Sequence, residues 1–422
     1  MQISMYFLYN LLYILALSFI FPLHLLKRPP HLRGRWLKER FGFVPMRIID
    51  PSWQGERYNH RPTIWIHVVS VGESISARPL IKRLMEQANV IVSTVTDTGQ
   101  KIVRDFITER ERCIYLPFDT PFAVKRVVSR MRPDLLVIME AELWPNLLRI
   151  VKGFGTPVLI VNGRISNRSF FGYQKIRFFM KYLLMMVDYY CMQTDGDAER
   201  IIALGAPEKR VCVTGNLKFD SIPTEEEIPL WCKDLSRPII IAGSTHKGEE
   251  EIILNTFYTI KKDFKEATLI IAPRHPERFR EVEDGLLKRR KLEFGKRSNG
   301  SYKDKEIILL DTIGELFSVY GCADLCIIGG SLVPKGGHNL FEPAYWAKPI
   351  VCGPHMENFP LASDFFRNNA AVMVRRDNID KVLIKILSDK STAEEMGRGA
   401  RELYIKNRGA TSKTLEVVNR FV

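Results

Sequence analysis

Short runs of apolar, often β-branched residues alternate along the chain with longer segments of helical periodicity. Strands that are apolar at every position lie in parallel sheets covered by helices on both faces. The pattern therefore predicts an α/β protein with two successive sets of strands. The first set is Thr63–Val71, Asn89–Val95, Cys113–Pro117, Leu135–Met139, Val158–Asn162, Tyr189–Thr194 and Val211–Gly215; the second is Pro238–Gly243, Thr268–Pro273, Ile307–Leu310, Leu325–Ile328, Pro349–Gly353 and Ala371–Val374.

A polar, acidic segment at residues 222–229, IPTEEEIP, separates the two sets. Prolines near both of its ends are typical of a linker. A chain of 422 residues also exceeds the usual size of one hydrophobic core. We therefore expect two Rossmann-like domains that face a cleft, in residues 27–221 and 230–405, with a C-terminal helix in 406–422 that packs back on the first domain.

Residues 1–26 form an apolar segment that contains no acidic or basic side chain other than His24. About 20 apolar residues suffice for a helix to cross a bilayer. Basic residues follow at once, beginning with Lys27 and Arg28 and continuing to Arg40. Because positive charge stays on the cytoplasmic side, the sequence predicts a single N-terminal membrane anchor with the remaining chain in the cytoplasm.

Two alternatives exist for this apolar segment. A cleaved signal peptide is disfavoured, because the basic residues lie after the apolar run and no small-x-small cleavage motif is present. A helix that lies in the membrane interface stays open, since Tyr6, Tyr9, Asn10 and Tyr13 make one side less apolar. Both membrane-bound alternatives place the rest of the protein at a membrane surface.

The formal net charge of +14 predicts an anionic partner, such as a phospholipid surface, a nucleic acid or a phosphorylated substrate. Arg164–Tyr182 is a basic amphipathic segment that suits lipid or acceptor phosphates, although an ordinary exposed helix explains it equally well. Basic patches interleaved with aromatic residues, typical of single-strand binders, are missing, so we expect no nucleic acid partner. Seven scattered cysteines without a CxxC pair indicate reduced thiols.

Acidic residues follow two strands of the first set. Glu73 comes after Thr63–Val71, and Glu140 and Glu142 come after Leu135–Met139. Ligands of such sheets bind at the carboxyl ends of the strands, where Glu73 could accept a proton from an attacking hydroxyl. Helix capping is the alternative for each: Ser70 with Glu73 has capping-box spacing, and acids are favoured at helix N-termini.

Asp195 and Asp197 form an Asp-x-Asp pair after a strand, and such a pair can hold a divalent cation against a diphosphate. A helical segment that ends at Gly205 follows directly, so either aspartate also suits an N-cap. We favour the cap, and no other cluster has metal-ligand spacing. The sequence thus predicts no metal site.

The second set contains a glycine-rich stretch, Gly329–Pro343, GGSLVPKGGHNLFEP. Its glycine pairs allow close approach of the backbone to a ligand. Asn339–Trp346 is expected to form a helix whose N-terminus faces an anion, with Glu342 available to sugar hydroxyls. An ordinary strand-to-helix turn is the alternative. The donor side chains within the stretch are Ser331, Lys335, His338 and Asn339.

Three more strand ends of this set carry possible ligand groups. We expect Gly243, Ser244 and Thr245 to open a helix as a small phosphate cradle. Arg274 follows the next strand and could bind a phosphate or a base carbonyl. Gly314 lets a ligand approach the backbone. Solvated loops and a helix cap explain each feature singly, but their convergence on one sheet edge favours a ligand site.

Several motifs in this order resemble the 3-deoxy-D-manno-octulosonic acid (Kdo) transferases of Gram-negative lipopolysaccharide assembly: SVGE, ELWPN, GNLKFD, GSTHKGEE, PRHPER, IGELF and GGHNLFEPA. The resemblance extends roughly from Arg33 to Arg408. It implies a GT-B glycosyltransferase at the cell inner membrane, which moves Kdo from CMP-Kdo to the glucosamine disaccharide of a lipid A precursor, lipid IVA. It also implies inversion at the anomeric centre, with no metal and no cofactor.

The resemblance further implies roles for individual residues. Glu73 would be the general base, and Glu142 and Lys218 would stabilise the transition state. Glu342 would bind the ribose, and backbone amides near Gly337 the single phosphate, which needs no metal. The implied CMP-binding residues are Pro273, Arg274, Ile313, Gly314, Glu315, Asn339, Leu340, Phe341 and Glu342; further donor-site candidates are Ser244, Thr245, Gly336, Gly337 and His338.

Two other classes of protein share part of this pattern. Another GT-B transferase, which uses a nucleotide sugar and a lipid-linked acceptor, would share the glycine-rich stretch and Glu342 but not SVGE together with ELWPN. A non-enzymatic basic protein of the membrane surface would explain the charge but not the acids at the strand ends.

Overall fold

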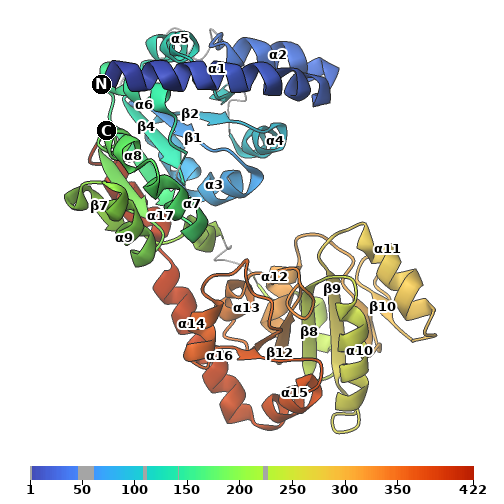
Figure 1. Cartoon of the computed structure of the whole chain (residues 1–422). Helices are drawn as coiled ribbons and strands as arrows, with labels where there is room; N and C mark the ends of the chain where they lie inside the picture. Colours follow the sequence, from blue (N-terminus) through green and yellow to red (C-terminus); the bar gives the residue numbers. More distant parts are fainter. Residues whose placement is uncertain (1, 46–60, 108–111, 141, 222–226) are drawn as a thin grey trace. The chain divides into compact units, whose positions relative to one another are not determined.

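The computed structural model describes residues 2–45, 61–107, 112–140, 142–221 and 227–422. The chain forms two compact units (Figure 1). Unit 1 comprises Met1–Ser221 together with Arg408–Val422, and unit 2 comprises Ile222–Asn407. Residues 222–226 of the expected linker lie outside the described residues.

Unit 1 is built on a seven-stranded sheet with the order β3-β2-β1-β4-β5-β6-β7. Every neighbouring pair in it is parallel. The central strands are buried at nearly every position, which explains their continuous apolar sequence. The strands are β1 (Thr63–His67), β2 (Asn89–Thr94), β3 (Cys113–Tyr115), β4 (Leu135–Met139), β5 (Val158–Gly163), β6 (Tyr189–Met192) and β7 (Val211–Val213).

Helices cover both faces of this sheet, and each face has its own apolar core. Leu80 of α3, Val103 of α4 and Val417 of α17 belong to one core, whereas Leu147 of α6 and Ile201 of α9 belong to the other. The helices of unit 1 are α1 (Gln2–Lys27), α2 (Pro30–Arg40), α3 (Val71–Met85), α4 (Asp97–Phe106), α5 (Pro121–Met131), α6 (Pro145–Gly153), α7 (Asn167–Gln174), α8 (Arg177–Leu184), α9 (Asp195–Leu204), α17 (Ala410–Val418) and the 3₁₀ turns η4 (Glu208–Arg210) and η5 (Leu217–Ser221).

Helix α17 brings the last residues of the chain into unit 1. The Asp220 carboxylate accepts hydrogen bonds from the backbone N–H groups of Gly409 and Thr411 and so holds the start of this helix. Ala410 and Val418 are fully buried in the same core as α3.

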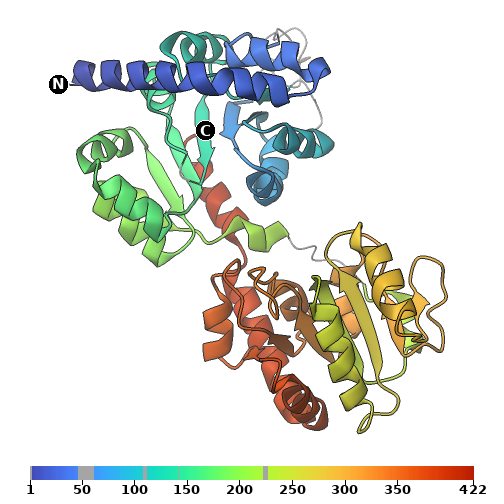
Figure 2. The same cartoon turned by 45° about the vertical axis from the view of Figure 1, so that its right-hand side comes forward.

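Unit 2 has a second parallel sheet of seven strands, with the order β10-β11-β9-β8-β12-β13-β14. Figure 2 shows this sheet with α10 and α16 beside it. Its strands are β8 (Ile239–Thr245), β9 (Thr268–Pro273), β10 (Gly295–Lys296), β11 (Ile307–Leu309), β12 (Leu325–Ile328), β13 (Ile350–Cys352) and β14 (Val372–Met373); its helices are η6 (Leu230–Asp234), α10 (Glu249–Ile260), α11 (Arg278–Val282), η7 (Glu283–Lys288), α12 (Leu316–Val319), η8 (Tyr320–Cys322), α13 (Phe341–Tyr345), α14 (Ala362–Arg367), α15 (Ile379–Ser388) and α16 (Lys390–Asn407).

The predicted α/β fold with two parallel sheets is confirmed, and the local differences have physical causes. The expected strand Thr63–Val71 ends at His67, because Ser70 caps a helix that begins at Val71. The strand Gly295–Lys296 was not predicted, since two residues carry no alternating pattern. The helix expected at Asn339–Trp346 is the shorter Phe341–Tyr345, because the Asn339 side chain accepts from the Phe341 N–H just before it.

The order of strands locates the switch point of each sheet. Strand β1 lies between β2 and β4 in unit 1, and β8 lies between β9 and β12 in unit 2. Loops that leave neighbouring strands in opposite directions open a crevice at the carboxyl ends of such strands. The acidic candidates of unit 1 follow β1 and β4, and in unit 2 Arg274 and the glycine-rich stretch follow β9 and β12.

Candidate active site

Glu73 is fixed at the start of α3 by a variant of the capping box, in which its carboxylate accepts from the residue before the N-cap Ser70. The Ser70 hydroxyl accepts from the Glu73 N–H at 3.3 Å and donates to Glu73 Oε1 at 2.9 Å, while Oε2 accepts from the Val69 N–H at 2.8 Å. The side chain is only 7% exposed. The capping interpretation is thus confirmed, and the carboxylate has one fixed orientation at the carboxyl end of β1.

Two more carboxylates, Glu140 and Glu142, follow β4, the neighbour of β1. Burial raises the pKa of Glu142, and the negative charges of Glu73 and Glu140 raise it further. Burial and the charge of Glu73 also raise the pKa of Glu140. The three carboxylates therefore form one cluster, in which proximity disfavours simultaneous ionisation.

Cationic side chains balance part of this negative charge. Lys218 in η5 and Arg164 after β5 both counteract the rise in the pKa of Glu140. Glu140 itself has a left-handed backbone with φ 58°, which is uncommon for a residue other than glycine. Such strain is typical of functional sites. Glu73, Glu142 and Lys218, distant in sequence, are thus brought to one edge of the unit 1 sheet.

Asp195 and Asp197 begin α9, but neither is its N-cap. Thr194 caps the helix, and Asp197 accepts from the Thr194 hydroxyl at 2.6 Å and from the Ile165 N–H at 2.9 Å. The helix does have a side-chain N-cap, as expected, but the capping residue is Thr194 and not an aspartate. Among the described residues, no group of three or more His, Cys, Asp or Glu side chains is arranged to hold a metal ion.

In unit 2, a buried carboxylate holds the glycine-rich stretch. Glu249, the first residue of α10, accepts backbone hydrogen bonds from Gly330 at 2.6 Å, His246 at 2.9 Å and Leu332 at 2.9 Å. Its side chain is fully buried. Sequence reasoning missed Glu249, although the motif GSTHKGEE contains it.

The second glycine pair of the stretch is tightly enclosed. A Cβ at Gly336 would lie 2.3 Å from the Asn358 side chain, and one at Gly337 would lie 2.3 Å from Met356 Sδ. Both residues also have a left-handed backbone, with φ 88° and 70°. Only glycine fits here without strain, so the loop keeps one shape.

Glu342 lies in α13, near the end of the glycine-rich stretch, and is half-buried. Burial raises its pKa, while the positive charge of Arg274 and a hydrogen bond with Asn339 oppose the rise. Arg274 itself is exposed, and its backbone N–H donates to the Thr245 carbonyl at 3.0 Å. The structure thus brings three predicted nucleotide-binding residues together at one edge.

The segment Ile313–Glu315 presents an open surface. Ile313 is 79% exposed, and a Cβ at Gly314 would meet nothing within 4 Å. Glu315 is held by Arg297, whose Nε and Nη2 donate to the two carboxylate oxygens at 2.9 and 3.1 Å, and by the Thr312 hydroxyl. This arrangement leaves the Gly314 backbone exposed.

Three histidines gather beside the glycine-rich stretch. The Nε2 atoms of His246 and His338 lie 2.8 Å apart, with the rings stacked, and the His275 ring contacts His246 edge-on. Burial, together with the positive charge of Arg274, lowers the pKa of His338 to about 4. His246 and His275 were not predicted, because residues 29 positions apart in sequence give no common signal.

Ser244 and Thr245 do not open a helix, so that expectation is wrong. Strand β8 continues to Thr245, and α10 begins four residues later, after Gly248 with φ 95°. The Thr245 side chain is fully buried and donates to Glu250 Oε1 at 2.8 Å. The Thr245 carbonyl, and not its hydroxyl, bonds the loop after β9, where it accepts from the Arg274 N–H.

Solved structures of similar fold define the class of protein. A glycosyltransferase from Rickettsia africae has a TM-score of 0.56 at 15% identity, with 86% of this chain and 99% of that chain covered. UDP-GlcNAc 2-epimerase from Neisseria meningitidis also gives 0.56, at 12% identity, with coverage of 85% and 100%. The fold is therefore of the GT-B type, with two Rossmann-like units.

Sequence relatives identify the particular family. The family model of 3-deoxy-D-manno-octulosonic-acid transferase (kdotransferase) matches residues 35–221. The transferase of this name from Haemophilus influenzae is 34% identical over 94% of this chain and 93% of its own, and that from Bordetella pertussis is 30% identical over 96% and 98%. The chain belongs to the Kdo transferase family and is a glycosyltransferase, as the motifs predicted.

Proposed function

We propose that this protein transfers Kdo from CMP-Kdo to the glucosamine disaccharide of a lipid A precursor, lipid IVA, with inversion at the anomeric centre and without a metal ion. The observation that carries the proposal is the fixed Glu73 carboxylate within a cluster of acids and Lys218 at the edge of the unit 1 sheet. Family membership supports the transferred sugar.

In unit 1, Glu73 acts as the general base. Its two hydrogen bonds hold the carboxylate in place, so that it can take the proton of the acceptor hydroxyl as the new glycosidic bond forms. Lys218 stabilises negative charge on the Kdo carboxylate or the departing phosphate. Glu142, whose pKa is raised, stabilises the positive charge that develops on the sugar.

In unit 2, the nucleotide binds at the carboxyl ends of β8, β9 and β12. Backbone amides near Gly337 hold the single phosphate, and Glu342 binds the ribose hydroxyls. Arg274 with Pro273, and the open backbone of Ile313–Glu315, contact the base. The remaining donor-site residues proposed here are Asn339, Leu340, Phe341, Ser244, Thr245, Gly336 and His338.

We place the protein at the cytoplasmic side of the inner membrane. Among the described residues, one helix, Met5–Lys27, is long and apolar enough to cross a bilayer, with mean hydropathy 1.8. The positive charge of the chain suits both phospholipid headgroups and the phosphates of the acceptor, without a role for nucleic acid.

The test is Kdo transfer from CMP-Kdo to tetraacylated lipid IVA by purified protein in excess EDTA, with product detected by mass. We expect product from the wild type and almost none from Glu73→Gln. Wild-type protein that is folded and binds CMP but forms no product would overturn the proposal and point to another nucleotide sugar or acceptor. If the wild type forms product without EDTA but none with it, the proposed independence of a metal ion would be overturned, while the proposed donor and acceptor would stand.

A further inference from the structure

Helix α1 contacts unit 1 along its whole length, through one stripe of side chains. Figures 1 and 2 both show it lengthwise beside α2 and α5. The stripe repeats every three or four residues, which is the spacing of one helix face. Its members, all partly or fully buried, are Tyr6, Tyr9, Asn10, Tyr13, Leu17, Phe21 and Leu25.

Polar contacts hold the first half of this stripe to a buried carboxylate. The Tyr9 hydroxyl donates to Asp119 Oδ2 at 2.7 Å, and the Tyr13 hydroxyl accepts from the Asp119 N–H at 3.0 Å. Asn146 Nδ2 donates to Asn10 Oδ1 at 2.7 Å. Asp119 is 1% exposed, so removal of α1 would uncover a polar site that the helix now completes.

Tyr6 shows that even the start of α1 lies on unit 1. It is 5% exposed, and its hydroxyl donates to the Pro145 carbonyl at 3.3 Å. The Arg149 guanidinium lies 4.4 Å from the centre of its ring, and the Tyr182 ring contacts it edge-on. The start of the helix is therefore held on unit 1, as its later turns are.

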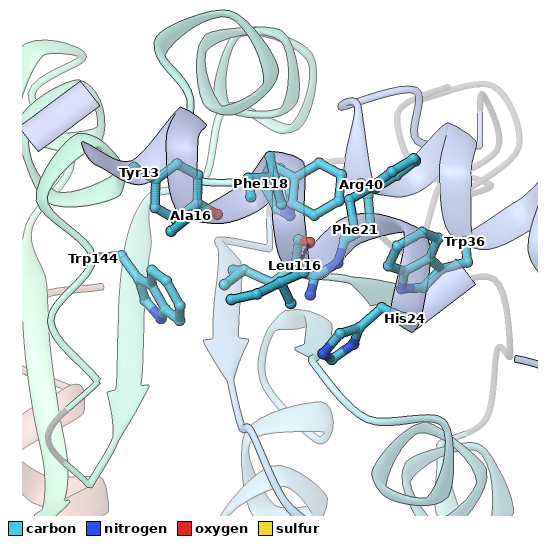
Figure 3. A pocket seen from close by; sticks show the side chains of 12 residues that line it. Tyr13, Ala16, Phe21, His24, Trp36, Arg40, Leu116, Phe118 and Trp144 are labelled. Carbon is cyan, nitrogen blue, oxygen red and sulfur yellow. Dashed lines mark hydrogen bonds between the residues drawn. The ribbon is translucent and has the colours of Figure 1, made fainter. Parts of the chain in front are cut away.

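The second half of the stripe closes over a cavity of about 200 Å³ (Figure 3). Phe21 of α1 stacks on Trp36 of α2 with 5.8 Å between ring centres and contacts Phe118 edge-on. Arg40 lies over the Phe118 ring at 4.9 Å and also lines the cavity. The inner face of α1 is therefore matched to unit 1 by aromatic packing as well as hydrogen bonds.

The opposite face of α1 is apolar and exposed, and the apolar surface continues beyond the helix. A groove of about 410 Å³ joins α1 to the segment Lys175–Phe179, where Ile176 and Phe178 are 50% and 62% exposed. Lys175 and Arg177 border these residues and suit anionic headgroups. The exposed large apolar residues of α1 are Phe7, Leu8, Leu11, Leu12, Ile14, Leu15, Phe19, Ile20, Leu23 and Leu26.

We propose that α1 lies in the plane of one leaflet, docked on unit 1 along its length with its outer face among acyl chains, and does not cross the bilayer. A crossing helix would either abandon Asp119 or draw Asp119 and Arg149 into hydrocarbon, where charges are costly. The segment around Phe178 enters the same leaflet. The inference deepens, and rests on, the membrane attachment proposed above.

The first test is topology in spheroplasts of a bacterial host. The full chain carries Gln2→Cys in a Cys212→Ser background, because the other native cysteines are buried. An in-plane helix predicts no reaction with an impermeant maleimide until detergent is added. Reaction in intact spheroplasts would show a crossing helix and overturn the inference. Ser391→Cys, exposed in unit 2, is the matched control that stays protected in either case.

The second test measures depth with spin labels at Leu8, Leu15 and Leu26, which share the outer face. In-plane α1 predicts nearly equal depths for all three. A crossing helix predicts that Leu15 lies about 10 Å deeper than Leu8 and about 16 Å deeper than Leu26 along the normal, from the rise of 1.5 Å per residue. That gradient would overturn the inference, whereas recovery of the protein in the soluble fraction would instead overturn membrane attachment itself.

Discussion

Ser70 and Glu73 hold each other at the start of α3: the serine hydroxyl donates to the carboxylate at 2.9 Å and accepts from the glutamate N–H at 3.3 Å. Glu73 thus belongs to the helix cap and is also the proposed general base. Substitutions at the two positions separate the two roles.

Glu73→Gln keeps an oxygen to accept from Val69 but removes the proton acceptor. We expect kcat for Kdo transfer to fall about 10²- to 10⁴-fold, as is typical of a lost general base. Ser70→Ala removes the cap and should cost about 1 kcal/mol of stability, and it should lower kcat far less than Glu73→Gln, because the Val69 N–H still holds the carboxylate. Steady-state rates and thermal melts of both variants check this, and a smaller rate loss in Glu73→Gln than in Ser70→Ala would contradict the assignment.

Glu142→Gln should stabilise unit 1 at neutral pH. Because the pKa of Glu142 is raised in the folded protein, ionisation costs more there than in the unfolded chain. The cost is absent below the ordinary value of 4.5 and grows as pH rises through the folded pKa. Melting temperatures of the variant should therefore exceed wild type at pH 8 and match it near pH 4, while transfer activity falls. Glu402→Gln, at an exposed position of α16, is the control, and an equal gain from it would refute the argument.

Glu249→Gln should disorder the glycine-rich stretch. An amide offers one acceptor oxygen where the carboxylate now serves three backbone N–H groups. We expect a loss of about 1–3 kcal/mol in stability and at least about tenfold in CMP affinity, since hydrogen bonds to charged groups contribute about 1.5–3 kcal/mol each, and the burial that raises the pKa of Glu249 offsets part of this contribution. Calorimetric titration with CMP measures the affinity. Glu251→Gln, two positions along on the exposed side of α10, should bind CMP normally, and a normal affinity in Glu249→Gln would argue against the clamp.

Gly337→Ala and Gly300→Ala form a matched pair, because the two glycines have φ of 70° and 72°. A Cβ at Gly337 would overlap Met356, whereas one at Gly300 would meet nothing within 4 Å. Gly300→Ala should cost only about 1 kcal/mol from the backbone. Gly337→Ala should cost clearly more and should also weaken CMP binding. Equal costs in denaturant melts would show that the enclosure of Gly337 does not matter.

The sequence predicted the sheets because their central strands are apolar at every position, as in Leu135–Met139. It singled out Glu73 and Glu142 because both follow strands of the first set, and Glu342 because it lies near the end of the glycine-rich stretch. Glu249 escaped prediction, since its role depends on Gly330, a residue 81 positions away that only the fold brings near. The sequence predicted that β8 ends at Gly243, whereas the strand continues to Thr245. Gly248, not Gly243, has the left-handed backbone that precedes α10.

The contribution of α17 to unit 1 has a consequence for synthesis. The ribosome releases Ala410–Val418 only after all of unit 2, although this helix packs in the core formed by strands made much earlier. Unit 2, which is continuous in sequence, can close while the chain is still growing, whereas unit 1 is complete only after α17 has been made. A nascent chain that stalls after Asn407 would therefore expose the apolar surface of α3 that α17 covers. Unit 1, although it is synthesised first, would remain open to chaperones after unit 2 has folded.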